Sequence, residues 1–221
     1  MTPNLLTLAR ILTAFGAVAL FSLRPHLLAV DLTAVLLTVT AMLLDGLDGY
    51  LARVRGLATP FGAKFDILGD RLVENLFFTC FAASGLISLW VPVLFFARGA
   101  LTDFLRGLAS RPRGNVGDQE WMAKTGWGRS LVASRASRAS YATLKCMCFC
   151  YLGLLLSIRH GPDALSHGWF GESRALTIAQ AITLATVVFC IARAIPVIWE
   201  GRQYFSARPK APRTVPVAAS R

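Results

Sequence analysis

The chain has 221 residues, of which 55% are hydrophobic and only 16% are charged, and its mean hydropathy is +0.54. This apolar share is above that of ordinary soluble domains and predicts a membrane protein. The net charge of +11 could suggest nucleic acid as a partner, but the basic residues lie between apolar segments, which favours anionic lipid headgroups and no nucleic acid.

Six apolar segments are long enough to form membrane-spanning helices, which need about 20 such residues each. They cover residues 5–23, 27–52, 63–89, 91–109, 139–158 and 175–199. The opening PNLLTLAR predicts a short amphipathic segment before the first span. We therefore expect an all-α integral membrane protein with six transmembrane helices. The membrane domain should cover residues 1–200, and the basic, proline-rich tail of residues 201–221 should be disordered.

The basic residues between the spans predict the orientation of the chain. They concentrate in residues 106–138, in the turn after the second span and in the tail, all on one side of a six-span topology. The opposite side carries only Arg24, Arg159 and Arg174. Positive charge marks the cytoplasmic side, so both termini should lie there.

Four aspartates lie at the cytoplasmic ends of the second and third spans. Asp45 and Asp48 are three residues apart, and Asp66 and Asp70 are four apart, so each pair shares one helix face. With no basic partner expected beside them, four carboxylates near hydrocarbon need bound cations. Oxygen ligands favour Mg²⁺ or Mn²⁺, and a pair of such ions is a recurring device for phosphoryl transfer.

The stretch around these aspartates reads DGLDGYLARVRGLATPFGAKFDILGD. It resembles the signature of the CDP-alcohol phosphotransferases, Asp-x2-Asp-Gly-x2-Ala-Arg, eight residues, then Gly-x3-Asp-x3-Asp. Every fixed position is met, by Asp45, Asp48, Gly49, Ala52, Arg53, Gly62, Asp66 and Asp70. The opening PNLLTLAR is similar to that of family members which make phosphatidylglycerophosphate.

The resemblance implies transfer of a phosphatidyl group from CDP-diacylglycerol to a small alcohol such as glycerol 3-phosphate, with release of CMP. It implies that Asp45, Asp48, Asp66 and Asp70 hold two Mg²⁺ or Mn²⁺ ions and that Asp70 also acts as the catalytic base. The CDP site would be formed by Asp45, Asp48, Gly49, Ala52, Arg53, Gly62 and Asp66. The resemblance further implies a homodimer in the inner membrane of a bacterium, with its active site facing the cytoplasm.

Arginines in the fourth and fifth spans are candidates for binding the acceptor. Arg98 lies within a span, where an arginine must face a polar cavity or a partner. Arg98, Arg106, Arg135 and Arg138 could together bind a phosphate. Alternatively, Arg98, Asp103 and Arg106 form an ion network that only packs helices, and the fifth-span arginines contact lipid phosphates. Because arginines would suit any phosphorylated acceptor, the residue types do not identify the alcohol. Inositol phosphate, serine or phosphatidylglycerol stay open as acceptors.

Several other residues have two interpretations. Asn4 and Arg10 either lie over the nucleotide or serve as a helix cap and an interfacial anchor. Glu74 either orients a metal ligand or pairs with Arg71 or Arg98. The five cysteines all fall in apolar runs, which favours small buried side chains over disulfides or a zinc site.

Two other functions use aspartates within a membrane. An intramembrane prenyltransferase has aspartate pairs far apart in sequence, whereas one short turn separates the pairs here. A cation or proton transporter could use the aspartates as a relay, but it would not need Gly49 and Arg53 beside them.

Overall fold

The computed structural model describes residues 3–23, 27–54, 59–109, 131–132, 134–159 and 172–205. In this part of the chain all regular structure is helical, in agreement with the predicted fold class. The helices are α1 (Pro3–Ser22), α2 (Leu28–Val54), α3 (Pro60–Ala83), α4 (Trp90–Ala109), α6 (Arg135–Arg159) and α8 (Glu172–Phe205).

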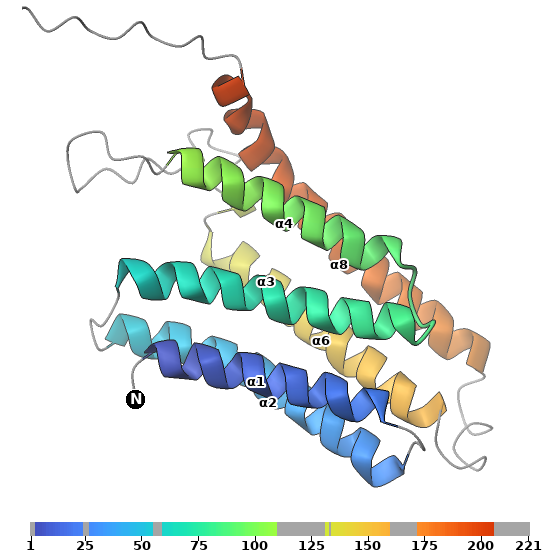
Figure 1. The fold of residues 1–221 in the computed structure, drawn as a ribbon. Helices are drawn as coiled ribbons and strands as arrows, with labels where there is room; N and C mark the ends of the chain where they lie inside the picture. Colours follow the sequence, from blue (N-terminus) through green and yellow to red (C-terminus); the bar gives the residue numbers. More distant parts are fainter. Residues whose placement is uncertain are drawn as a thin grey trace, which may run out of the picture.

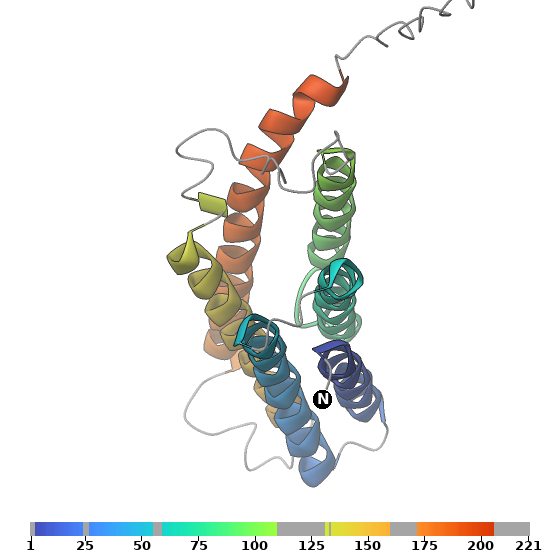
Figure 2. The same cartoon turned by 90° about the vertical axis from the view of Figure 1, so that its left-hand side faces the viewer.

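The helices form two layers (Figures 1 and 2). One layer contains α1, α3 and α4, and the other contains α2, α6 and α8. Within the layers, α3 packs on α1 and α4, while α6 packs on α2 and α8. Between the layers, α1 packs on α2, α3 on α6, and α4 on α8. Helix α3 is therefore central, because it packs on three other helices, α1, α4 and α6.

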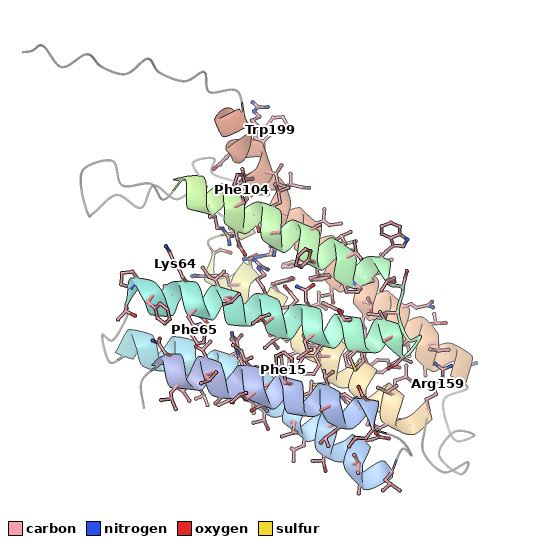
Figure 3. The ribbon with its side chains drawn as sticks, viewed as in Figure 1. Phe15, Lys64, Phe65, Phe104, Arg159 and Trp199 are labelled. Carbon is pink, nitrogen blue, oxygen red and sulfur yellow. The ribbon has the colours of Figure 1, made fainter. Side chains whose placement is uncertain are left out.

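Four of the helices are long and apolar enough to cross a membrane, over Asn4–Ser22, Ala29–Leu47, Ala136–Arg159 and Arg174–Arg202. The remaining two, α3 and α4, carry the charged residues described below, which lower their hydropathy. The count of six spans therefore stays a prediction. Large apolar side chains such as Phe15 point outward from the bundle (Figure 3), as expected for a surface in contact with lipid.

The ends of α3 follow from local sequence. Thr59 is the N-cap, and its hydroxyl accepts a hydrogen bond of 3.0 Å from the Gly62 N–H, while Pro60 occupies the first turn. At the other end Gly85 has a φ of 73°, and the Leu86 N–H donates to the Phe81 carbonyl. This arrangement is a Schellman motif. It ends α3 at Ala83, six residues before the predicted end of the third span, because a positive φ cannot continue the helix.

Two other boundaries also differ from the expected ones. The opening PNLLTLAR is part of α1 and not a separate segment, since the helix runs without a break from Pro3 to Ser22. Helix α8 continues to Phe205, through Pro196 and into the range predicted as a tail. The rest of the tail, residues 206–221, lies outside the described part of the chain.

An aromatic core fills one half of the bundle. Phe77, Phe78 and Phe81 of α3 are fully buried, together with Phe149 of α6 and Phe95 of α4. The ring centroids of Phe78 and Phe149 are 4.8 Å apart, and those of Phe78 and Phe95 are 4.4 Å apart. This packing stabilises the contacts of α3 with α4 and α6. It also leaves the first half of α3 for polar side chains.

Candidate active site

Three of the four motif aspartates converge in the structure. Asp45 comes from α2, and Asp66 and Asp70 come from successive turns of α3. One carboxylate oxygen of each lies within 4.8 Å of the others, and all three side chains are partly exposed. A close set of oxygen donors with access to solvent fits a hard divalent ion such as Mg²⁺ or Mn²⁺. Asp48 belongs to α2, but its side chain lies outside the described part.

Several side chains of the expected CDP site also lie outside the described part of the chain. Gly49, Ala52 and Arg53 are helical residues near the end of α2, and their side-chain surroundings are not among those described. Arg135, at the start of α6, has the same status. The predicted roles of these four residues therefore stay predictions.

Arg10 is the basic partner that the sequence analysis did not expect beside the carboxylates. Its side chain is only 1% exposed and forms an ion pair with Asp45. Its Nη1 lies 3.1 Å from Asp70 Oδ1, and its Nη2 lies 3.5 Å from Asp66 Oδ1. Nη2 also donates a hydrogen bond of 3.3 Å to the Asp66 carbonyl. The expectation of carboxylates without a basic partner is thus wrong, and Arg10 is too deeply buried to be an interfacial anchor.

Two glycines of α3 let α1 approach closely enough to bring Arg10 in. A Cβ on Gly69 would lie 2.7 Å from Arg10 Nη2 and 2.9 Å from Thr7 Cγ2. A Cβ on Gly62 would lie 2.7 Å from Asn4 Oδ1. A side chain at either position would displace these atoms of α1, so the two glycines leave the space that the Asn4, Thr7 and Arg10 side chains occupy. Gly62 belongs to the motif, whereas Gly69 was not singled out.

Glu74 links α3 to α6 one turn deeper in the bundle. Its side chain is 2% exposed, and Oε1 accepts a hydrogen bond of 3.0 Å from the Tyr141 hydroxyl. Lys145 Nζ lies 3.4 Å from Oε1, and Arg71 Nη1 lies 3.2 Å from Oε2. The predicted pairing of Glu74 with Arg71 is therefore confirmed. Two cations and a hydroxyl thus surround this buried carboxylate and offset the cost of its burial.

Arg71 also connects α3 to α4. Its Nε lies 3.0 Å from Asp103 Oδ2, and Arg106 Nη1 lies 3.4 Å from Asp103 Oδ1. The expected ion network thus forms around Asp103, but with Arg71 in the place proposed for Arg98. Within the described residues, the Nε of Arg98 is buried and has no hydrogen-bond partner. Arg98 is therefore the arginine of α4 best placed to bind an anion.

Arg193 of α8 belongs to the same group of arginines, although it was not among the residues predicted to bind the acceptor. It interacts electrostatically with Arg98, Arg106 and Arg138. Its guanidinium donates a hydrogen bond of 2.6 Å to Ser137 Oγ and lies 5.4 Å from the centre of the Tyr141 ring. The position of Arg193 within an apolar segment is the sequence feature that indicates such a site, because an arginine within a span needs a polar environment.

A cavity lies between α2, α3 and α6, next to the carboxylates. Its polar lining includes Arg10, Asp45, Asp70, Glu74 and Lys145. Among the described side chains, its lining includes Lys145 but not Arg98, Arg106 or Arg138. The structure therefore has two candidate places for binding an anionic acceptor. One is Lys145 in the cavity, and the other is the group formed by Arg98, Arg106, Arg138 and Arg193.

The fold and the site together define a helical membrane protein whose central helices bring a carboxylate cluster to one end of the bundle. A family model described as CDP-alcohol phosphatidyltransferase matches residues 1–199. The chain belongs to the CDP-alcohol phosphatidyltransferase family, in agreement with the resemblance found in the sequence.

The chain is also similar to curated relatives. A segment of 71 residues is 44% identical to a Rickettsia typhi protein named CDP-diacylglycerol--glycerol-3-phosphate 3-phosphatidyltransferase. It covers 32% of this chain and 39% of the relative. A segment of 104 residues is 34% identical to a Mycobacterium tuberculosis protein named "Probable phosphatidylglycerophosphate synthase" and covers 47% of this chain and 50% of the relative. The matches thus span half or less of these relatives.

Proposed function

We propose that this protein transfers the phosphatidyl group of CDP-diacylglycerol to glycerol 3-phosphate and releases CMP. The observation that carries the proposal is the convergence of Asp45, Asp66 and Asp70 from the two helices that contain the family motif. The names of the Rickettsia and Mycobacterium relatives support glycerol 3-phosphate as the acceptor. Inositol phosphate, serine and phosphatidylglycerol are the alternative acceptors.

The carboxylates would hold the divalent ions. Two Mg²⁺ or Mn²⁺ ions on Asp45, Asp48, Asp66 and Asp70 would supply positive charge to the diphosphate and to the departing CMP. In the same proposal, Asp70 takes the proton from the acceptor hydroxyl while the oxygen of that hydroxyl attacks the β-phosphorus. The bond between that phosphorus and the oxygen of CMP breaks. Gly49, Ala52, Arg53 and Gly62 shape the CDP site.

The membrane supplies the rest of the proposed arrangement. The acyl chains of the donor stay in the bilayer beside the helices, so the site opens laterally to lipid. We propose that the carboxylates lie on the cytoplasmic side of the inner membrane of a bacterium, and the distribution of basic residues supports this orientation. We also propose that the protein is a homodimer, as its family suggests.

The test is to incubate the purified protein with CDP-diacylglycerol, Mg²⁺ and one alcohol at a time, and to identify the lipid product. We expect CMP and phosphatidylglycerophosphate with glycerol 3-phosphate. A different lipid product would reassign the acceptor. Prenyl transfer, or cation flux without CMP release, would overturn the proposed reaction class.

The arginine group is proposed to bind the phosphate of the acceptor. Arg98 has a buried Nε without a hydrogen-bond partner among the described residues, and Arg106, Arg138 and Arg193 add positive charge around it. A phosphate dianion would relieve the repulsion between these guanidinium groups and accept their hydrogen bonds.

Replacing Arg98 with methionine should therefore raise the KM for glycerol 3-phosphate. A charge-assisted hydrogen bond is worth about 1.5–3 kcal/mol, which corresponds to a roughly tenfold to hundredfold increase. The KM for CDP-diacylglycerol should change little, because the motif residues bind the donor. Lys145→Met is the comparison variant, since Lys145 lines the cavity as well as pairing with Glu74. If only the lysine variant loses affinity for the acceptor, the phosphate binds in the cavity and not at the arginines.

A further inference from the structure

Helix α6 carries two cysteines on one face, one helical turn apart. The Sγ atoms of Cys146 and Cys150 are 4.0 Å apart, and both are free, partly buried thiols. Cys148 lies between them in sequence but points elsewhere, because its Sγ is buried 3.7 Å from Thr183 Oγ1 of α8. Cys146 and Cys150, the thiol pair, are therefore separated from the third cysteine by the geometry of the helix.

The thiol pair is next to the candidate active site. Cys146 lines the same cavity as Asp45, Asp70 and Lys145. A small solute that enters this cavity therefore meets two different sets of ligands, carboxylate oxygens from α2 and α3 and a sulfur from α6. Cys150 lies behind Cys146, within contact distance of the same sulfur.

The separation of the two sulfurs suits a single soft metal ion. Metal–sulfur bonds of about 2.3 Å allow two thiolates on one ion to lie up to about 4.6 Å apart, and a tetrahedral ion places them about 3.8 Å apart. The observed 4.0 Å lies between these limits. We propose that Cys146 and Cys150 form a binding site for a soft, thiophilic metal cation, in the wall of the cavity.

Binding at this site requires no oxidation. Each thiol loses its proton to the solvent and its sulfur forms a bond to the cation, so that two protons are released for each ion bound. In this proposal water supplies the remaining ligands, and no histidine flanks the pair in sequence. Thiolates select soft cations, whereas the carboxylates select hard ones, so the two sites of the cavity prefer different metals.

One consequence rests on the proposed function. An ion bound to Cys146 adds charge and bulk to the cavity that the reaction uses, so it should lower turnover. Excess Mg²⁺ should not reverse this inhibition, because hard ions compete poorly for thiolates. The binding itself does not depend on the proposed function and can be measured separately.

The experiment titrates the purified full-length protein with Cd²⁺ and follows the thiolate-to-metal charge-transfer absorbance in the ultraviolet. The wild type should bind Cd²⁺ and release two protons per ion at this site. Cys150→Ser removes one of two direct ligands, so it should weaken the affinity by more than the roughly 10–100-fold that loss of an outer-shell partner costs. Cys148→Ser is the matched control on the same helix and should bind as the wild type does.

The activity assay adds a second comparison. Turnover of the wild type and of Cys148→Ser should fall with Cd²⁺ in the presence of excess Mg²⁺, whereas Cys150→Ser should resist. If Cys150→Ser keeps the absorbance band at wild-type affinity, the site is wrong. If it loses the band but remains inhibited, inhibition occurs at the carboxylates and the link to turnover is wrong. Should the protein lack transferase activity altogether, the absorbance titration still decides the metal site.

Discussion

Replacing Asp66 with alanine is expected to lower turnover by about a thousandfold or more while the helical fold is retained. Asp66 is one of three carboxylates whose oxygens lie within 4.8 Å of one another, and loss of a preorganised charged group at a phosphoryl-transfer site has effects of this size. Mn²⁺ binding, measured by electron paramagnetic resonance, should weaken in parallel. In the wild type, a chelator should stop the reaction and Mg²⁺ or Mn²⁺ should restore it.

Asp70→Asn is the companion variant, because it separates the base from the ligands. A general base contributes about 10²–10⁴-fold to the rate. If Asp70 is the base, kcat should fall by this factor while affinity for CDP-diacylglycerol changes little. A parallel loss of donor binding and turnover would mean that Asp70 only holds the metal. Full activity in the presence of a chelator would contradict the metal-dependent proposal for all these aspartates.

Removal of Arg10 is expected to have the second large effect, and this effect should depend on the metal. The guanidinium of Arg10 is 1% exposed and contacts Asp45, Asp66 and Asp70. Without it, three neighbouring carboxylates repel one another. Loss of one partner of a buried ion pair costs about 3–5 kcal/mol, and partial exposure of the carboxylates here reduces this to about 1–3 kcal/mol.

In a chelator, Arg10→Ala should therefore melt at a lower temperature than the wild type. Added Mn²⁺ should raise its melting temperature by more than it raises that of the wild type, because the ion replaces the missing positive charge. Lys64→Ala is the matched control, since Lys64 is an exposed cation near the start of α3 and points away from α1 (Figure 3). It should behave as the wild type does. Equal metal-induced shifts in the wild type and in Arg10→Ala would show that Arg10 does not neutralise the metal ligands.

Features that depend on neighbours along the chain could be predicted from the sequence. The helical class and the pairing of Asp66 with Asp70 on one face both arise from the periodicity of the helix. These effects act over three or four residues. The motif spacing also identified the family correctly, since the family model covers residues 1–199.

The tertiary structure decided which helix faces meet. Arg10 and Asp66 are 56 residues apart, Tyr141 and Glu74 are 67 apart, and Arg193 and Ser137 are 56 apart. Periodicity shows that each of these residues lies on a particular face of its own helix, but it contains no information about the partner of that face. The partner is set by close packing, such as the contact of α1 with Gly62 and Gly69. For this reason the sequence alone determined the carboxylate motif, the helical class and the family. Only the packed bundle revealed that Arg10 neutralises the carboxylates, that Arg193 joins the other arginines, and that the thiol pair lies beside the cavity.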